Sequence, residues 1–138
     1  MSVTITLTDD LDTCLALRRV VFIEEQNVPE PDEIDGLDPD CLHLLAVDGA
    51  TPVGTARILI EGDMAKIGRV CVLKSHRGTG LGAALIRAAL GAAQGQATQA
   101  MLGAQIHALG FYEKLGFMAT GPVYDDAGIP HRDMVRPL

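Results

Sequence analysis

The sequence contains no tryptophan, and its aromatic content is only 4%. Apolar residues still make up 48% of the 138 residues, so we expect a core of leucine, alanine, valine and isoleucine. No apolar run approaches the roughly 18 residues that a membrane-spanning helix needs, and the first residues lack the features of a secretory signal. These absences favour one domain over residues 1–138, in the cytoplasm and without membrane contact.

Cysteine is scarce as well, and its number is odd. Cys14, Cys41 and Cys71 each lie in or beside an apolar run. This usage is typical of reduced, buried thiols rather than a disulfide framework. We expect no metal site.

Two segments each lack charged residues of one sign, the first lacking basic residues and the second lacking acidic ones. Residues 24–40 hold eight acids and no lysine or arginine, whereas residues 64–112 hold no acid. A formal net charge of −7 argues against general nucleic-acid binding, but the basic segment suits one small polyanion. The acidic segment could attract a cationic amine or be a solvated, proline-broken loop. Arg69 could pair with it or steer a cofactor.

Hydrophobic periodicity predicts alternating strands and helices. Three strands joined by short polar turns indicate an antiparallel meander. The fold class that follows is α/β (α+β), with a mixed central sheet, an antiparallel N-terminal meander and helices on both faces. The expected strands are 2–7, 41–47, 52–60, 65–73, one within 95–104, 117–121 and 131–138; the expected helices are 11–26, 81–92 and 105–115.

The segment "SHRGTGLG", residues 75–82, lies between a predicted strand and a predicted helix. Helix N-termini expose unpaired N–H groups, and glycines let an anion approach them. Arg77 and Lys74 would add positive charge. The alternative is a turn that is glycine-rich for geometry alone. The pattern is neither a nucleoside-triphosphate P-loop nor a Rossmann fingerprint.

The motif "RGTGLG", as Arg-x-x-Gly-x-Gly, resembles the acetyl-CoA signature of the GNAT N-acetyltransferase superfamily. "QIHALGFYEKLGF" resembles that superfamily's closing helix and strand, and "LRRVVFIEEQ" and "GIPHRDM" resemble the ElaA-like bacterial branch. The resemblance implies direct transfer of acetyl from acetyl-CoA to the amine of a small molecule or protein, without a metal. It also makes a homodimer an expectation.

The resemblance assigns roles to individual positions. The pantetheine arm of CoA would pair with the backbone of Val70, Cys71 and Val72. Tyr112 would protonate the departing thiolate as general acid, although a lone tyrosine is often only a half-buried packing residue. The residues expected to hold the pyrophosphate are Arg77, Gly78, Thr79, Gly80, Leu81 and Gly82.

Gln105 stands seven residues before Tyr112, where the superfamily often has asparagine. Positions i and i+7 share one face of a helix, so we expect both side chains to face the cofactor. An ordinary polar helix residue remains the alternative for Gln105.

The general base is less clear, because residues 66–73 contain no glutamate where many relatives have one. Glu25 and His43 are the two selected candidates, with imidazole favoured near neutral pH. Glu24, His107 and His131 are also considered. His107 lies about 140° from Tyr112 around the expected helix, which counts against it.

Two other functions compete with the enzyme. A CoA-binding module without catalysis would keep the pyrophosphate site and make Tyr112 dispensable. A phosphate binder on an unrelated fold would leave "FYEKLGF" and the meander unexplained. Direct transfer needs no cysteine nucleophile, so Cys71 is expected to be a buried packing residue.

Overall fold

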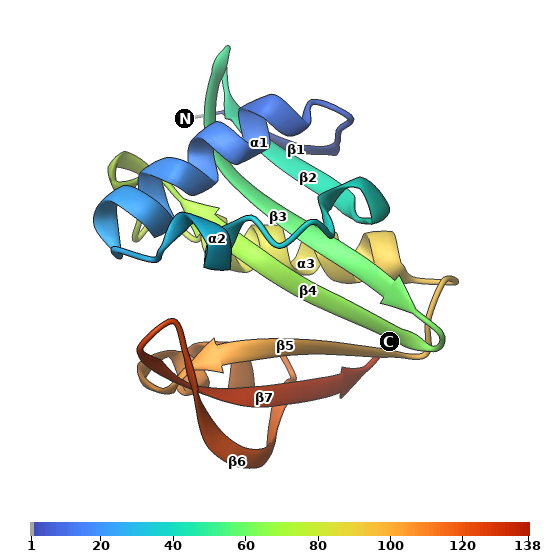
Figure 1. Ribbon diagram of the computed structural model, residues 1–138. Coiled ribbons are helices and arrows are strands. Elements are labelled where there is room, and N and C mark those ends of the chain that lie inside the picture. The colour runs from blue at the N-terminus through green and yellow to red at the C-terminus, as the bar shows by residue number, and fades with distance from the viewer. Residues whose placement is uncertain (1) are drawn as a thin grey trace.

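One seven-stranded sheet organises the computed structural model, which describes residues 2–138 (Figure 1). The strand order is β1-β2-β3-β4-β5-β7-β6, and all neighbours are antiparallel except β4 and β5. The mixed sheet and its N-terminal meander are therefore confirmed. The strands are β1 Val3–Leu7, β2 Leu42–Asp48, β3 Thr51–Glu61, β4 Met64–Val72, β5 Gln99–Gln105, β6 Met118–Asp126 and β7 Ile129–Pro137.

Helices lie on both faces of this sheet, as expected: α1 crosses the near face in Figure 1 and α3 lies behind the strands. The first helix is longer than α1 itself, because the chain continues into a π-helical segment, η1. The helical elements are α1 Leu11–Arg18, η1 Arg19–Glu25, α2 Glu30–Glu33, η2 Asp38–Asp40, η3 Lys74–His76, α3 Leu81–Ala93, η4 Ile106–Ala108 and α4 Leu109–Glu113.

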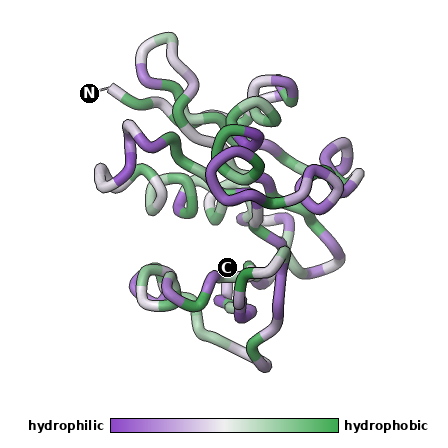
Figure 2. The backbone as a smooth tube through the Cα atoms, turned by 60° about the vertical axis from the view of Figure 1, so that its left-hand side comes forward, coloured by the Kyte–Doolittle hydropathy of each residue, from purple (hydrophilic) through white to green (hydrophobic). Residues whose placement is uncertain are grey.

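The alternation of side chains along β2 divides the core into two clusters. Leu44 and Ala46 pack in the cluster that includes α3, whereas Leu45 packs with Cys14 of α1 and Cys71 of β4. Figure 2 shows hydrophobic stretches along the strands and beside them, with hydrophilic turns between. Burial raises the pKa of the Cys71 thiol to about 12, so this cysteine is a neutral packing residue.

The C-terminal half differs from the sequence prediction in two places. The helix expected over 105–115 is wrong at its start, because Gln105 ends β5 and only residues 109–113 are α-helical. The loop expected over 122–130 is instead strand, closed by a tight turn at Ala127 and Gly128, both with positive φ. Gly121, Pro122 and the aspartates at 125 and 126 conceal the strand character of β6, which tolerates a proline because it is at the edge of the sheet.

The parallel strands β4 and β5 part after a short contact. Only Met64–Lys66 of β4 pair with β5, at residues 99–101. Beyond them β4 also bulges against β3, where the register shifts between Thr55 and Arg57 and Arg69 takes a φ of 52°. The sheet therefore opens at the end of β4 that leads to the glycine-rich segment.

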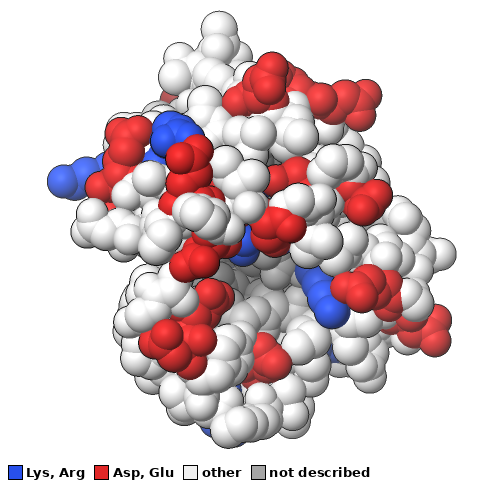
Figure 3. All heavy atoms as spheres, viewed as in Figure 1, with Lys and Arg blue, Asp and Glu red and all other residues white. Residues whose placement is uncertain are grey.

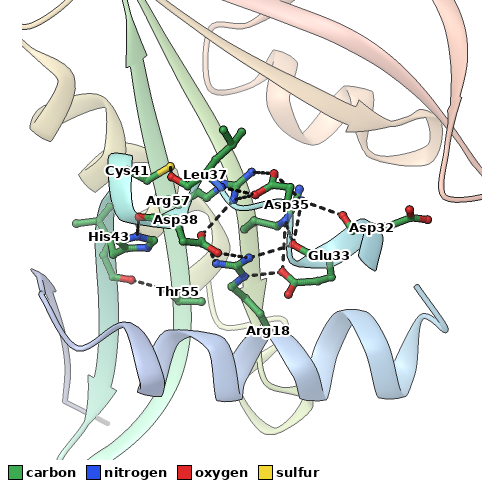
Figure 4. A network of polar contacts seen from close by, with 12 residues as sticks. Arg18, Asp32, Glu33, Asp35, Leu37, Asp38, Cys41, His43, Thr55 and Arg57 are labelled. Carbon is green, nitrogen blue, oxygen red and sulfur yellow. Dashed lines mark hydrogen bonds and ion pairs between the residues drawn. The ribbon is translucent and has the colours of Figure 1, made fainter. Parts of the chain in front are cut away.

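The acidic connector is pinned to the sheet by buried ion pairs (Figure 4). Arg18, 1% exposed, donates from Nε to Glu33 at 2.6 Å and from Nη1 to Asp38 at 2.6 Å. Arg57 pairs with Asp38 at 3.1 Å and with Asp35. The expectation of a solvated loop is therefore wrong for Glu33 and Asp38, which are buried, whereas Asp35 stays partly exposed while it pairs with Arg57.

Arg69 joins the same group of charges. Its guanidinium reaches Asp35 at 3.2 Å and Glu33 at 3.3 Å, and it also donates to the backbone carbonyls of Asp32 and Glu33. We call Arg18, Glu33, Asp35, Asp38, Arg57 and Arg69 the ion cluster. It contains three positive and three negative side chains, so its formal charge is balanced.

We expect Arg18→Met to lower the free energy of unfolding by about 3–5 kcal/mol, because Glu33 and Asp38 would each lose one of their two arginine partners and the buried cluster would keep one uncompensated negative charge. Arg19→Met is the matched control, since the neighbouring Arg19–Glu30 pair is about half exposed and such pairs contribute at most about 1 kcal/mol. Urea unfolding of both variants measures the difference. Equal losses would show that the ion cluster does not hold the connector.

Low pH should weaken the ion pairs of the ion cluster and so lower the free energy of unfolding. The hydrogen bond from Arg57 holds the pKa of Asp35 below its usual range, and hydrogen bonds from Arg18 and Arg57 outweigh burial to lower that of Asp38. A lowered folded-state pKa stabilises the fold above the unfolded value and loses that contribution as pH falls. We expect the free energy of unfolding to fall steeply below about pH 4, and less steeply in Asp35→Asn.

Candidate active site

The glycine-rich segment forms an open cradle at the start of α3. The N–H groups from Gly78 to Ala83 donate to no acceptor in residues 2–138; the first helical hydrogen bond is Ala84 N–H to Gly80 O at 3.0 Å. Gly80 caps the helix with a φ of 86°, and no side chain caps it among the described residues. Four of these residues, Gly78, Gly80, Gly82 and Ala83, line one pocket of about 340 Å³ at the positive end of the helix dipole.

Local contacts hold this cradle in shape. Gly78 and Gly80 both have positive φ, which other residues adopt only with strain. Thr79 Oγ1 donates to the His76 carbonyl at 2.6 Å, and Arg77 Nε donates to the Val72 carbonyl at 3.0 Å. Of the predicted cradle residues, Arg77, Gly78, Gly80 and Gly82 line this pocket, whereas Thr79 and Leu81 do not.

Glu25 lies at the same cradle rather than at a reaction centre. Its carboxylate pairs with Arg77 Nη2 at 2.9 Å, and it does not line the larger cavity described below. The structure therefore places Glu25 beside Arg77 and outside the larger cavity.

The backbone of Val70, Cys71 and Val72 lies along the open edge of β4. Cys71 and Val72 pair with Thr55 and Gly54 of β3 on one side. On the side facing β5 the paired ladder ends at Lys66. An extended group could therefore run along β4 there as an additional strand would.

A second and larger cavity, of about 500 Å³, lies where the two strands part. Its walls come from η1, the acidic connector, β3, β4, β5, α4 and the β6–β7 hairpin. Figure 3 shows this face hollowed between the two parts of the molecule, with acidic side chains on both rims. Apolar contact comes from Phe22, Val28, Leu37 and Leu59.

The cradle and the cavity adjoin each other. Val72 and Phe111 line the cradle pocket, while Val70 and Tyr112, their neighbours along the chain, line the cavity. The edge of β4 thus connects the two spaces. A molecule with an anionic end and an extended arm would reach from one to the other.

Tyr112 projects from α4 at this junction. Its ring packs edge-on against Phe111 and Phe117, with centroids 5.0 Å and 6.2 Å away. Burial raises the pKa of the Tyr112 hydroxyl, which keeps it protonated at neutral pH. A protonated hydroxyl at the cavity wall is what a general acid requires.

Of the predicted residues Gln105 and His43, only Gln105 lies at the cavity. Gln105 lines the cavity together with Tyr112, although it does so from the end of β5 and not from a shared helix. His43 does not line it: this side chain is 7% exposed, and its Nε2 lies 2.8 Å from the carbonyl of Asp38. Its Nδ1 is buried without a partner in the described chain. The geometry makes His43 part of the packing behind the ion cluster.

The cavity is also lined by side chains that the sequence analysis did not select as site residues. Tyr124 lies in the segment read as a loop, and Arg57 is hidden within an apolar strand pattern. His131, one of the histidines considered, also lines the cavity. The glycine-containing turn just before "IPH" was the available signal that this histidine begins a returning strand.

The charges around the cavity are partly cancelled. Arg57 and Arg69 belong to the balanced ion cluster, and Lys66 pairs with Glu61 at 3.0 Å. Asp32 and Asp126 also line the cavity and have no ion-pair partner in residues 2–138. The cavity rim therefore carries a net negative charge.

Among the described residues, no group of histidine, cysteine, aspartate or glutamate is arranged to hold a metal ion. Within residues 2–138, no helix has both the length and the apolar character to cross a membrane.

Comparison with known proteins agrees with this geometry. Residues 22–138 match the family model of the acetyltransferase (GNAT) domain. An uncharacterized N-acetyltransferase of Bacillus subtilis, YjcF, is 39% identical over 130 residues, which cover 93% of each chain. An acyl-CoA N-acyltransferase from Pseudomonas aeruginosa superposes with a TM-score of 0.89 at 35% identity, over 98% of this chain and 99% of that one.

The ElaA protein of Escherichia coli is a further relative. It is 39% identical over 129 residues, which cover 88% of this chain and 84% of ElaA. The crystal structure of ElaA superposes with a TM-score of 0.86 at 33% identity, over 98% of this chain and 99% of that one. The chain therefore belongs to the GNAT acetyltransferase family, and the protein is an N-acetyltransferase.

Proposed function

We propose that this protein transfers acetyl from acetyl-CoA directly to the primary amine of a small molecule bound in the 500 Å³ cavity. The observation that carries the proposal is the continuity of the cradle, the β4 edge and the cavity. Val72 and Phe111 line the first space, and Val70 and Tyr112 line the second. A donor bound along β4 would present its thioester where Tyr112 lies.

The cradle suits the pyrophosphate of CoA. Its six free N–H groups and the dipole of α3 would hold the phosphate oxygens, and Arg77 adds a full positive charge beside them. The N–H and C=O groups of residues 70–72 would bind the pantetheine arm. Cys71 itself would contribute only its backbone, because its side chain packs with Cys14 in the core.

The cavity suits a small cationic acceptor better than a protein chain. Residues from helices, strands and the acidic connector surround it, and Phe22, Val28 and Leu59 offer apolar contact. Asp32 and Asp126 leave its rim negative, which attracts an ammonium group. The balanced ion cluster adds no net charge that would oppose this attraction.

A cofactor-binding module without catalysis is the alternative. It would need the cradle but no acceptor cavity and no protonated hydroxyl beside the β4 edge. The position of Tyr112 at the junction of both spaces favours the enzyme.

The proposal is tested by calorimetry with acetyl-CoA, CoA and ATP, followed by release of free thiol from acetyl-CoA. Ethanolamine, putrescine, spermidine and tyramine serve as probe amines, with hydroxylamine as a small neutral nucleophile. Binding of CoA species but not ATP, together with amine-dependent thiol release, is the expected result. Binding without thiol release for any of them would favour the module.

We expect Gly82→Asp to weaken acetyl-CoA binding at least about tenfold relative to Gly82→Ala, because its carboxylate would face the pyrophosphate. Gly82 lies in the first turn of α3 without positive φ, and an added Cβ would meet only Phe111 Cζ at 3.7 Å. An aspartate there also favours the helix dipole, so folding should be retained. Calorimetry at low and high salt measures the affinities, and the difference should shrink with salt.

Indistinguishable affinities of the Gly82→Asp and Gly82→Ala variants would place the pyrophosphate elsewhere. Gly78 and Gly80 are less suitable for this test because their positive φ would add backbone strain to any substitution.

We expect Tyr112→Phe to lower kcat by about 10²–10⁴-fold, the usual contribution of a positioned general acid. The affinity for acetyl-CoA should stay the same, since the ring contacts with Phe111 and Phe117 are kept. Steady-state kinetics and calorimetry on the same preparation provide both values. Turnover equal to that of the wild type would remove the hydroxyl from the reaction.

A further inference from the structure

We propose that His131 is the general base that takes the proton from the acceptor amine. This inference rests on the proposed function, because it assigns the second proton-transfer group of the same cavity. The histidine lies in β7, opposite Gln105 of β5 in the strand register. It lines the cavity into which Tyr112 also projects.

One ring nitrogen of His131 is already engaged. Nδ1 lies 2.7 Å from the carbonyl oxygen of Ile129. A carbonyl can only accept, so Nδ1 carries the hydrogen and Nε2 is left with its lone pair. Nε2 has no hydrogen-bond partner among the described residues. The backbone thus selects the tautomer in which the outer nitrogen can accept a proton.

The ring is also fixed in orientation. Tyr124 of β6 stacks on it, with centroids 6.0 Å apart and planes 24° from parallel. The hydroxyl of Tyr124 donates to Asp133 Oδ1 at 2.7 Å, which in turn anchors the tyrosine to β7. A base held by one hydrogen bond and one stacked ring loses little freedom when the acceptor binds.

The other proton acceptors of the cavity are less suitable. Glu33 is held between Arg18 and Arg69, and Glu61 pairs with Lys66. Asp32 and Asp126 are exposed at the rim. A solvated carboxylate is a far weaker base than an imidazole near neutral pH. Of the cavity residues, His131 alone combines a free lone pair with this basicity.

The charges that face His131 come from several elements. Tyr124 and Asp133 adjoin it directly, and Asp126 lies at the end of the same hairpin. Gln105 faces it from β5, and Tyr112 from α4 lines the same cavity. Arg57 and Arg69 lie across the cavity, but both are paired with Asp35.

The chemical step then balances with two protein groups. The acceptor binds as an ammonium ion, and Nε2 of His131 takes one proton from its nitrogen and passes it to solvent. The neutral nitrogen then forms a bond to the acetyl carbonyl carbon, and the bond from that carbon to the CoA sulfur breaks. The Tyr112 hydroxyl gives its proton to the departing thiolate, and the second proton lost by the nitrogen returns to the Tyr112 oxygen through solvent. The products are the N-acetylated amine, the CoA thiol and one released proton.

The first test needs no acceptor. Long-range ¹H–¹⁵N NMR of the whole protein at pH 8 reports which nitrogen of each histidine carries the hydrogen, with His131 assigned by its loss in His131→Gln. We expect the Nδ1–H form for His131. His43 is the internal reference for the opposite form, since its Nε2 faces a carbonyl oxygen. A hydrogen on Nε2 of His131 would overturn the proposal.

The second test measures turnover of His131→Gln, His131→Asn and the control His107→Gln. His107 is exposed in η4 and lies outside the cavity. With the best of the four probe amines, kcat of both His131 variants should fall about 100-fold or more. The acid limb of the pH profile of kcat should be flatter in both His131 variants than in the wild type. With hydroxylamine, which is already deprotonated at neutral pH, the loss should be much smaller.

The outcomes separate this inference from the proposed function. Wild-type protein that fails to bind acetyl-CoA contradicts the proposed function itself. Normal acetyl-CoA affinity with wild-type kcat in both His131 variants contradicts only the role of His131. An equal loss with hydroxylamine and with the protonated amines would also contradict it, because His131 would then be positioning the acceptor rather than taking its proton.

Discussion

The parting of β4 from β5 is the constraint on which the rest of the structure depends. Three paired residues on each strand hold the two parts of the sheet together, and the strands then diverge. The divergence leaves one edge of β4 without a partner strand and opens the cavity beside it. A fully paired sheet of the same composition would have neither space. Its incomplete hydrogen bonding is therefore the basis of the site.

Two structural features maintain the opening between β4 and β5. The bulge at Arg69 turns β4 away from regular pairing and brings the Arg69 side chain to the connector. The ion cluster then fixes the connector against α1 through Arg18 and against β3 through Arg57. Buried ion pairs contribute little net stability, but breaking one is costly. Their effect here is to define where the cavity wall stands.

The closing hairpin provides the other wall and much of its chemistry. β6 is at the edge of the sheet and largely exposed, yet with β7 it places Tyr124 and His131 at the cavity. The adjoining segments α4 and β5 contribute Tyr112 and Gln105. Groups from four elements thus meet around one space, although none of these elements would form it alone.

The sequence by itself determined the meander, the long helix α3 and the cradle, because each follows from local periodicity or from glycines at fixed spacing. It also placed Tyr112 through a recognisable motif. Only the tertiary structure decided which acids are buried, that Glu25 faces Arg77 and that His131 rather than His43 reaches the cavity. Local patterns cannot show these contacts, because each one joins residues that are far apart in the chain and meet only when the sheet is assembled.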